Sequence, residues 1–373
     1  MTEAKKKILV ISDHPLAPSG VGTQTKYVIE TLLATGKYKF ICLGGAVSHK
    51  DYQPQKISPW EDDWIVFPVK GYGSQEVIRS AIFNEKPDIV WFMTDPRFYE
   101  WLWTMENEVR AHVPMVYYHV WDNYPLPTYN KKYYESNDVI ASISKVTHDI
   151  VNNVAPNVEN HYVPHAVDSD IFLPLLDTDI TELKNKQFGE DDNRITFFWN
   201  NRNARRKMSG SLIFWFNEFA NEVGPDKVRL LLHTDPKDPE GFGLATFESL
   251  ACETPIIVNM TGGLQEQVTD GEQWFGIGIQ PSSKAIIGSQ QVPYIYEDRI
   301  SKEDFIAALK SIFNMTHGER KLLGMKGRNH VVKNYNFKNF QKQWVELIDS
   351  VIENHGSWET RKGYKPWSIK EIV

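Results

Sequence analysis

The sequence predicts an α/β protein built from two Rossmann-like, doubly wound domains, and three observations lead to this fold class. Short apolar runs alternate with helical patterns along most of the chain, which is typical of parallel sheets covered by helices. The 373 residues, 41% of them hydrophobic, are enough for two cores rather than one. The alternation occurs in two series, and the polar stretch 176–193 lies between them.

The first series predicts a domain over residues 1–165. Its expected strands are the apolar runs 8–11, 40–43, 64–67, 89–92, 115–118, 139–143 and 161–163. Helices are expected at about 23–34 and 74–84, and Ser144 is placed to cap a third. The second series predicts a domain over residues 166–352. It has expected strands at 194–199, 228–232 and 256–258 and expected helices near 302–313, 319–335 and 340–352.

The composition disfavours several partners and locations. A formal net charge of −7 argues against a nucleic-acid partner. No segment has the about eighteen uninterrupted apolar residues of a membrane span, and the run 8–11 is too short for a signal-peptide core. The two cysteines, Cys42 and Cys252, lie in apolar segments, so no disulfide framework is expected. We therefore expect a soluble, cytoplasmic protein.

Two carboxylates eight residues apart, Glu240 and Glu248, bracket a glycine-containing turn that runs into a helix. Positions i and i+8 lie near one helix face, and the free N–H groups at the helix start favour an anion. Glu240 can accept hydrogen bonds from sugar hydroxyls, and Glu248 can reach a ribose. The backbone amides of Phe242, Gly243 and Leu244 can face a phosphate. The alternative is an ordinary capped amphipathic helix.

This turn resembles the E-x7-E motif of retaining GT-B glycosyltransferases, particularly family 4, whose usual EGFGL opening stands unchanged at 240–244. The segment 262–266 is similar to the GGxxE segment of that family, and 164–172 resembles its interdomain hinge. The resemblance implies two domains that face a cleft, with the nucleotide-sugar against the second domain and the acceptor against the first. It also implies that the tail, 353–373, packs back on the first domain.

The second domain departs from this family at one place. Family members usually carry a helix, strand, helix and strand between the strand at 228–232 and the EGFGL turn, whereas here only 233–239 intervenes. A parallel crossover alone needs about a dozen residues or more. A segment is therefore missing between about Thr234 and Glu240. Either the protein carries a true deletion or, in our preferred interpretation, the sequence omits a segment of the natural protein. An omission predicts a Cα–Cα distance there far above the ~3.8 Å of a trans peptide.

Two cations follow the aromatic strand at 194–199. Arg202 and Lys207 are similar to the strand-end arginine of the family and its lysine five residues later. A planar guanidinium and an ammonium can together neutralise the charge that grows on a departing diphosphate. The alternative interpretation is a solvated basic loop.

Two features of the first domain complete the candidate site. Gly20 and Gly22 lie between the first strand and first helix and resemble the glycine-rich loop of GT-B first domains. A nicotinamide site fits less well, because Thr25 stands where a third glycine is needed. His119 ends the run 115–118 and resembles the histidine that contacts the donor sugar. A tight turn and a core histidine are the respective alternatives.

No metal or cofactor is expected. The D-x-D triplets at 168–170 and 177–179 lie in the hinge-like segment and the polar stretch, and the sequence has no zinc-ligand spacing, no nucleophile elbow and no phosphate-binding P-loop. In this interpretation Arg202 and Lys207 replace a metal ion, while Glu240 orients the sugar rather than acting as a nucleophile.

The prediction is thus a metal-independent, retaining, hexosyltransferase-type glycosyltransferase. Its donor is expected to be a UDP- or GDP-sugar, and its acceptor a glycan, lipid or protein. Two alternatives stay open. One is a degenerate GT-B module that binds a glycan or partner without turnover, which the missing pocket favours. The other is a GT-B-like enzyme of different chemistry, an epimerase or phosphorylase. The sequence does not choose the donor base or oligomeric state.

Overall fold

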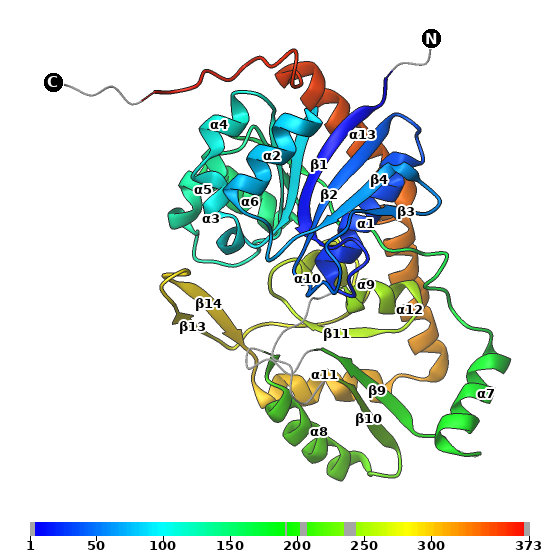
Figure 1. Cartoon of the computed structure of the whole chain (residues 1–373). Helices are drawn as coiled ribbons and strands as arrows, with labels where there is room; N and C mark the ends of the chain where they lie inside the picture. The colour runs from blue at the N-terminus through cyan, green and yellow to red at the C-terminus, as the bar shows by residue number, and fades with distance from the viewer. Residues whose placement is uncertain (1–3, 191, 202–206, 235–243, 369–373) are drawn as a thin grey trace. The chain divides into compact units, whose positions relative to one another are not determined.

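The computed structural model describes residues 4–190, 192–201, 207–234 and 244–368 (Figure 1). The chain divides into two compact units. Unit 1 comprises Met1–Ala166, Gly288–Ile295 and Phe337–Val373, and unit 2 comprises Val167–Ile287 and Tyr296–Asn336. The first break thus falls beside the expected boundary at 165/166, whereas the last helix belongs to unit 1 rather than to the second domain.

Unit 1 is built on an eight-stranded sheet with the order β3-β4-β2-β1-β5-β6-β7-β8. The strands are β1 (Lys6–Asp13), β2 (Tyr38–Gly45), β3 (Gln55–Ile57), β4 (Glu61–Pro68), β5 (Ile89–Thr94), β6 (Met115–His119), β7 (Val139–Ser142) and β8 (Glu159–Tyr162). All neighbours are parallel except β3 and β4, and each expected strand of this domain overlaps an observed one. The sequence pattern missed β3, because this short edge strand has no buried residue.

Helices cover both faces of this sheet. They are α1 (Gly20–Leu33), α2 (Gln75–Glu85), α3 (Glu100–Trp103), α4 (Glu106–Arg110), α5 (Lys131–Glu135), α6 (Lys145–Val154) and α13 (Phe337–His355), with 3-10 turns at Pro96–Phe98 and Thr128–Asn130. One apolar cluster joins the sheet to α1 and α13, and the other joins its opposite face to α2, α3, α4 and α6. Ser19, Ser74 and Ser144 cap α1, α2 and α6.

The helix α13 belongs to unit 1 because its apolar stripe packs on that sheet. Trp344 has no exposed surface, and its ring lies 5.8 Å from that of Trp91 and 4.9 Å from that of Tyr118. After α13 the chain runs to α4, where the Tyr364 hydroxyl and the Trp367 amide each donate to Asn107 Oδ1 at 2.9 Å. The tail thus lies on the first domain, at the amino end of the parallel strands.

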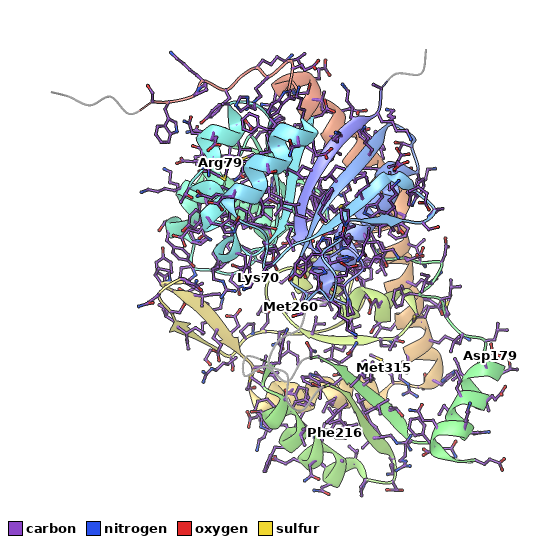
Figure 2. All side chains as sticks on the ribbon, viewed as in Figure 1. Lys70, Arg79, Asp179, Phe216, Met260 and Met315 are labelled. Carbon is purple, nitrogen blue, oxygen red and sulfur yellow. The ribbon has the colours of Figure 1, made fainter. Side chains whose placement is uncertain are left out.

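The described residues of unit 2 form three two-stranded sheets instead of one continuous sheet. The parallel pairs are β9 (Ile195–Asn200) with β10 (Val228–His233) and β11 (Ile256–Asn259) with β12 (Gly276–Ile279), and β13 (Ser283–Ile287) pairs with β14 (Ile295–Arg299). The helices are α7 (Asp177–Phe188), α8 (Ser209–Val223), α9 (Ala245–Ala251), α10 (Leu264–Val268), α11 (Lys302–Asn314) and α12 (His317–Asn334). One core joins α9, α12 and β11, and another joins α8, α11 and the strands and includes Phe216, which is labelled in Figure 2.

The separation of the two parallel pairs bears on the expected missing segment. Interior strands of a doubly wound sheet are buried on both faces. No residue of β9 is buried, and the Phe198 side chain is 55% exposed. If a central strand and the helix that covers it were absent, β9 would be exposed in this way. The stretch 235–243 lies outside the described residues, so the predicted Cα–Cα break is not tested.

Candidate functional site

The carboxyl ends of the parallel strands in unit 1 form one edge of its sheet. Asp13 ends β1, Thr94 ends β5, and His119 ends β6. Open α/β sheets bind ligands outside the carboxyl ends of their strands, because loops and helix starts gather there. The glycine loop and the histidine expected from the sequence therefore lie at the same edge.

The loop from β1 to α1 is held closely against the end of β1. The Gly22 amide donates to Ser19 Oγ at 2.9 Å, which caps the helix start. A Cβ atom on Gly22 would lie 2.8 Å from the carbonyl oxygen of His14 and 2.9 Å from that of Ala17. Only glycine fits at this position without displacing backbone. Gly20 is the first residue of α1 and is partly exposed.

Asp13 is the central acceptor of this loop, and sequence reasoning missed it. The Ser19 hydroxyl donates to Asp13 Oδ2 at 2.6 Å, and the Tyr72 hydroxyl donates to Oδ1 at 2.8 Å. Burial, together with the Asp13 charge, raises the pKa of Tyr72, so this phenol stays protonated and remains a donor. A strand-end aspartate directly before a glycine loop was the signal available in the sequence.

His119 lies at the predicted edge but is fully buried. Its Nε2 is 2.9 Å from the Tyr134 hydroxyl, and its ring packs against those of Tyr117 and Tyr134. Burial lowers the pKa of His119 to about 3, so the ring is neutral at pH 7. Nδ1 has no hydrogen-bond partner among the described residues. Contact of His119 with the donor sugar stays a prediction.

The other predicted site residues belong to unit 2. Lys207 follows β9 and is partly buried, and Leu244 precedes the first residue of α9. Phe247, Leu250 and Ala251 face the core of unit 2, and Glu248 lies beside this buried face and is itself partly buried. Burial raises the pKa of the Glu248 carboxyl. The placement of Leu244 and Glu248 on one turn agrees with the helix expected after the glycine turn.

Four predicted site residues lie outside the described part of the chain: Arg202, Glu240, Phe242 and Gly243. Their predicted roles stay predictions. Within unit 1 the structure brings Gly20, Gly22 and the Asp13 network together at the edge that also carries His119. In unit 2 it brings Leu244 and Glu248 together.

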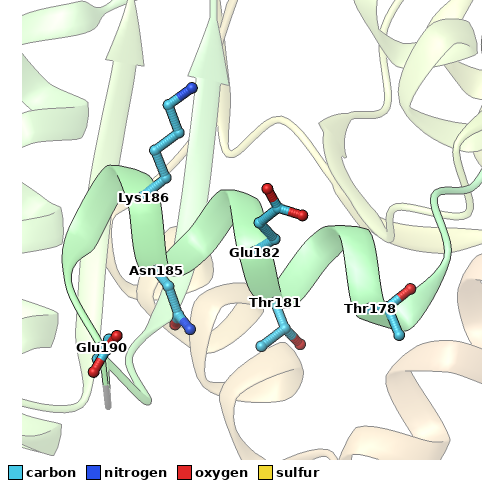
Figure 3. Close-up of a pocket in the computed structure, with 6 residues that line it drawn as sticks. All are labelled: Thr178, Thr181, Glu182, Asn185, Lys186 and Glu190. Carbon is cyan, nitrogen blue, oxygen red and sulfur yellow. The ribbon is translucent and has the colours of Figure 1, made fainter.

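Other features of the described residues do not offer a competing site. No cluster of three or more His, Cys, Asp or Glu side chains within them is arranged to hold a metal ion. An open hollow runs along α7 and contains none of the predicted site residues (Figure 3). It is lined by Thr178, Thr181, Glu182, Asn185, Lys186 and Glu190. Among the described helices, none has the length and apolar character needed to cross a membrane.

Comparisons with known proteins bear on both units. Residues 227–311 match the family model of glycosyl transferases group 1, and this range contains the E-x7-E turn. No curated protein matches the chain in sequence.

Solved structures share the fold across both units. A glycosyltransferase from Rickettsia africae ESF-5 is 15% identical and has a TM-score of 0.66, over 94% of this chain and 100% of its own. Anabaena HepE in complex with UDP and glucose is 14% identical, with a TM-score of 0.61 over 92% of this chain and 100% of its own. The α,α-trehalose 6-phosphate synthase of Burkholderia multivorans is 10% identical, with a TM-score of 0.63 over 94% and 99%. These structures show that the chain has the GT-B fold, and its match to the glycosyl transferases group 1 model covers residues 227–311.

Proposed function

We propose that the protein transfers a sugar from a nucleotide-sugar to a glycan, lipid or protein acceptor, with retention at the anomeric carbon. The observation that carries this proposal is the family match over 227–311, because it contains the turn with both glutamates. The fold shared with HepE, which was solved with UDP and glucose, supports a uridine donor. The free thiols Cys42 and Cys252 fit a cytoplasmic location.

The chemistry proposed for unit 2 is stabilisation of the leaving group. The bond between the anomeric carbon and the diphosphate oxygen breaks while a bond to the acceptor oxygen forms, and negative charge grows on the diphosphate. Arg202, Lys207 and the amides at 242–244 would neutralise this charge, and fixed donors aimed at developing charge are a large catalytic contribution. Such fixed cations would make a metal ion or other cofactor unnecessary.

Hydroxyl recognition is assigned to the glutamates. Glu248 would accept hydrogen bonds from the ribose, and Glu240 would orient the transferred sugar. In unit 1, the glycine loop would allow backbone to approach the donor or acceptor closely. His119 is neutral at pH 7, so its ring can take part in a hydrogen bond but cannot supply a proton as a general acid.

The experiment is a panel of nucleotide-sugars, measured by thermal shift and by release of nucleoside diphosphate. One donor is expected to raise the melting temperature and to be hydrolysed slowly. Lys207→Ala and Glu248→Ala should each lower diphosphate release by about 10²-fold or more, while Lys342→Ala on the exposed face of α13 should leave release unchanged. Full turnover in both site variants would refute the assignment.

A second function is favoured by a specific observation. Few residues lie between β10 and α9 in the sequence, and in the described part of unit 2 the two parallel pairs are not joined in one sheet. A GT-B module that binds a glycan or partner without turnover would have these features. In that case no donor would stabilise the protein or be hydrolysed. The assay must use protein whose sequence across 234–240 has been verified by mass spectrometry.

A further inference from the structure

The helix α7 stands out because none of its residues is buried. Leu176, Ile180 and Leu183 follow the spacing i, i+4, i+7, so they form one stripe along the helix. Their side chains are 70%, 40% and 51% exposed. The segment before the helix adds three exposed aliphatic residues to the same stretch: Ile171, Leu173 and Leu175.

Few contacts hold α7 to the rest of unit 2 in the described residues. Lys321 Nζ lies 3.5 Å from an Asp177 oxygen at one end, and the Arg229 guanidinium lies over the Phe188 ring at the other. A helix of 12 residues without packing is marginal in water, because nucleation is costly and most helix stability comes from a buried face. An apolar stripe this exposed is typical of an interaction surface.

The charges beside the stripe indicate which partner fits. Asp179 and Lys186 are seven residues apart and flank the stripe on one side, and Asp177 and Lys184 flank it on the other. Each flank therefore has an acid near the amino end and a lysine near the carboxyl end. Asp179 is exposed and is labelled on α7 in Figure 2, and Figure 3 shows Thr181 and Asn185 pointing to the side of the helix away from Lys186.

We propose that two copies of this chain associate through their α7 helices in an antiparallel pair. In that arrangement like flanks meet, so Asp179 of each copy lies near Lys186 of the other and Asp177 near Lys184. A parallel pair would instead place acids beside acids and lysines beside lysines. The two-fold symmetry is that of an isologous dimer, and the opposed helix dipoles also favour it. An alternative explanation is that these charges only stabilise the dipole of a single helix. That explanation does not account for the exposed apolar stripe between them.

The first test is the mass of the full chain in solution, measured by sedimentation equilibrium over a range of concentrations. We expect a reversible dimer. Ile180→Asp should raise the dissociation constant by at least tenfold, whereas the matched control Thr181→Asp, one residue away on the polar side, should leave it unchanged. Circular dichroism establishes that both variants fold. A monomer at all concentrations, or a dimer that Ile180→Asp does not weaken, would overturn the proposal.

The second test distinguishes the two helix directions. Asp179→Lys and Lys186→Asp should each weaken an antiparallel dimer severalfold, and the double variant that exchanges the charges should restore it. In a parallel dimer, Asp179→Lys alone would strengthen association, because it would place a lysine beside Asp177. That result, or failure of the exchange to restore the dimer, would overturn the antiparallel arrangement. The inference does not depend on the proposed transferase activity.

Discussion

The most stringent prediction concerns a buried charge network that fastens the chain after α13 to unit 1. Asp138 precedes β7, and its side chain is only 4% exposed. Its Oδ1 accepts from Arg361 Nη2 at 2.6 Å, and its Oδ2 accepts from Arg110 Nε at 3.3 Å and from the Met115 amide at 2.8 Å. Arg361 also donates from Nε to the Arg110 carbonyl oxygen at 2.7 Å.

Asp138→Asn keeps the size of the side chain but removes the negative charge between two cations. The side chains of Arg110 and Arg361 are 14% and 6% exposed, so water cannot fully replace the lost partner. Breaking a buried ion pair in this way costs about 3–5 kcal/mol of unfolding free energy. Arg361→Ala should cost about as much, and the double variant should cost less than the sum, because both act on one network.

The assay is denaturant unfolding followed by tryptophan fluorescence, with hydrogen exchange of the β6 and β7 amides to report on unit 1 itself. The second measurement is needed because two compact units need not unfold together. Glu346→Gln is the control, since its pair with Lys342 is exposed and such pairs contribute little. If Asp138→Asn lowered the unfolding free energy no more than this control, the network would not fasten the tail.

Three further predictions concern unit 1. Trp344→Ala should destabilise it by about 3–5 kcal/mol, measured by the same unfolding assay, because the fully buried ring leaves a cavity. Gly22→Ala should lower donor binding in calorimetry, since its Cβ would meet two carbonyl oxygens, whereas Gly210→Ala has open space and should not. The pKa of His119 falls from 6.5 to about 3 on folding. The unfolded chain therefore binds the proton more readily, so stability from neutral His119 is present above pH 6.5 and is lost as the pH falls toward 3. Unfolding free energies of His119→Gln should depend less on pH in this window.

The strands of unit 1 could be predicted because the residues themselves carry the signal. Buried parallel strands are nearly continuous apolar runs, and β5 and β6 contain no exposed residue. The placement of α13 could not be predicted this way. An amphipathic pattern indicates that a helix has a buried face, but not which sheet covers that face. Trp344 meets Trp91, more than two hundred residues earlier, and no local pattern reports that contact.

The candidate site likewise combines residues with a local sequence signal and contacts between residues far apart in the sequence. Gly22 was predictable, because a glycine between a strand and a helix carries a local backbone requirement. The Asp13 to Tyr72 hydrogen bond joins residues 59 positions apart, so it became visible only in the fold. His119 ends its strand, as the sequence predicted. Its burial depends on contacts with Tyr117 and Tyr134, and the many aromatic residues nearby in the sequence did not indicate which of them the ring would contact.

Unit 2 carries one conflict between local sequence and fold, and this conflict is informative. β9 has the aromatic and β-branched residues of an interior strand, but its Phe198 side chain is 55% exposed, and Leu232 on β10 is 38% exposed. Sequences are usually consistent between local preference and final environment, so an interior-type strand at an open face indicates that its neighbour is absent. The short connection between β10 and α9 is the place where a strand and its helices would enter. The absence of this strand would also remove part of the nucleoside pocket. Weak donor binding and the exposure of β9 would then have the same cause.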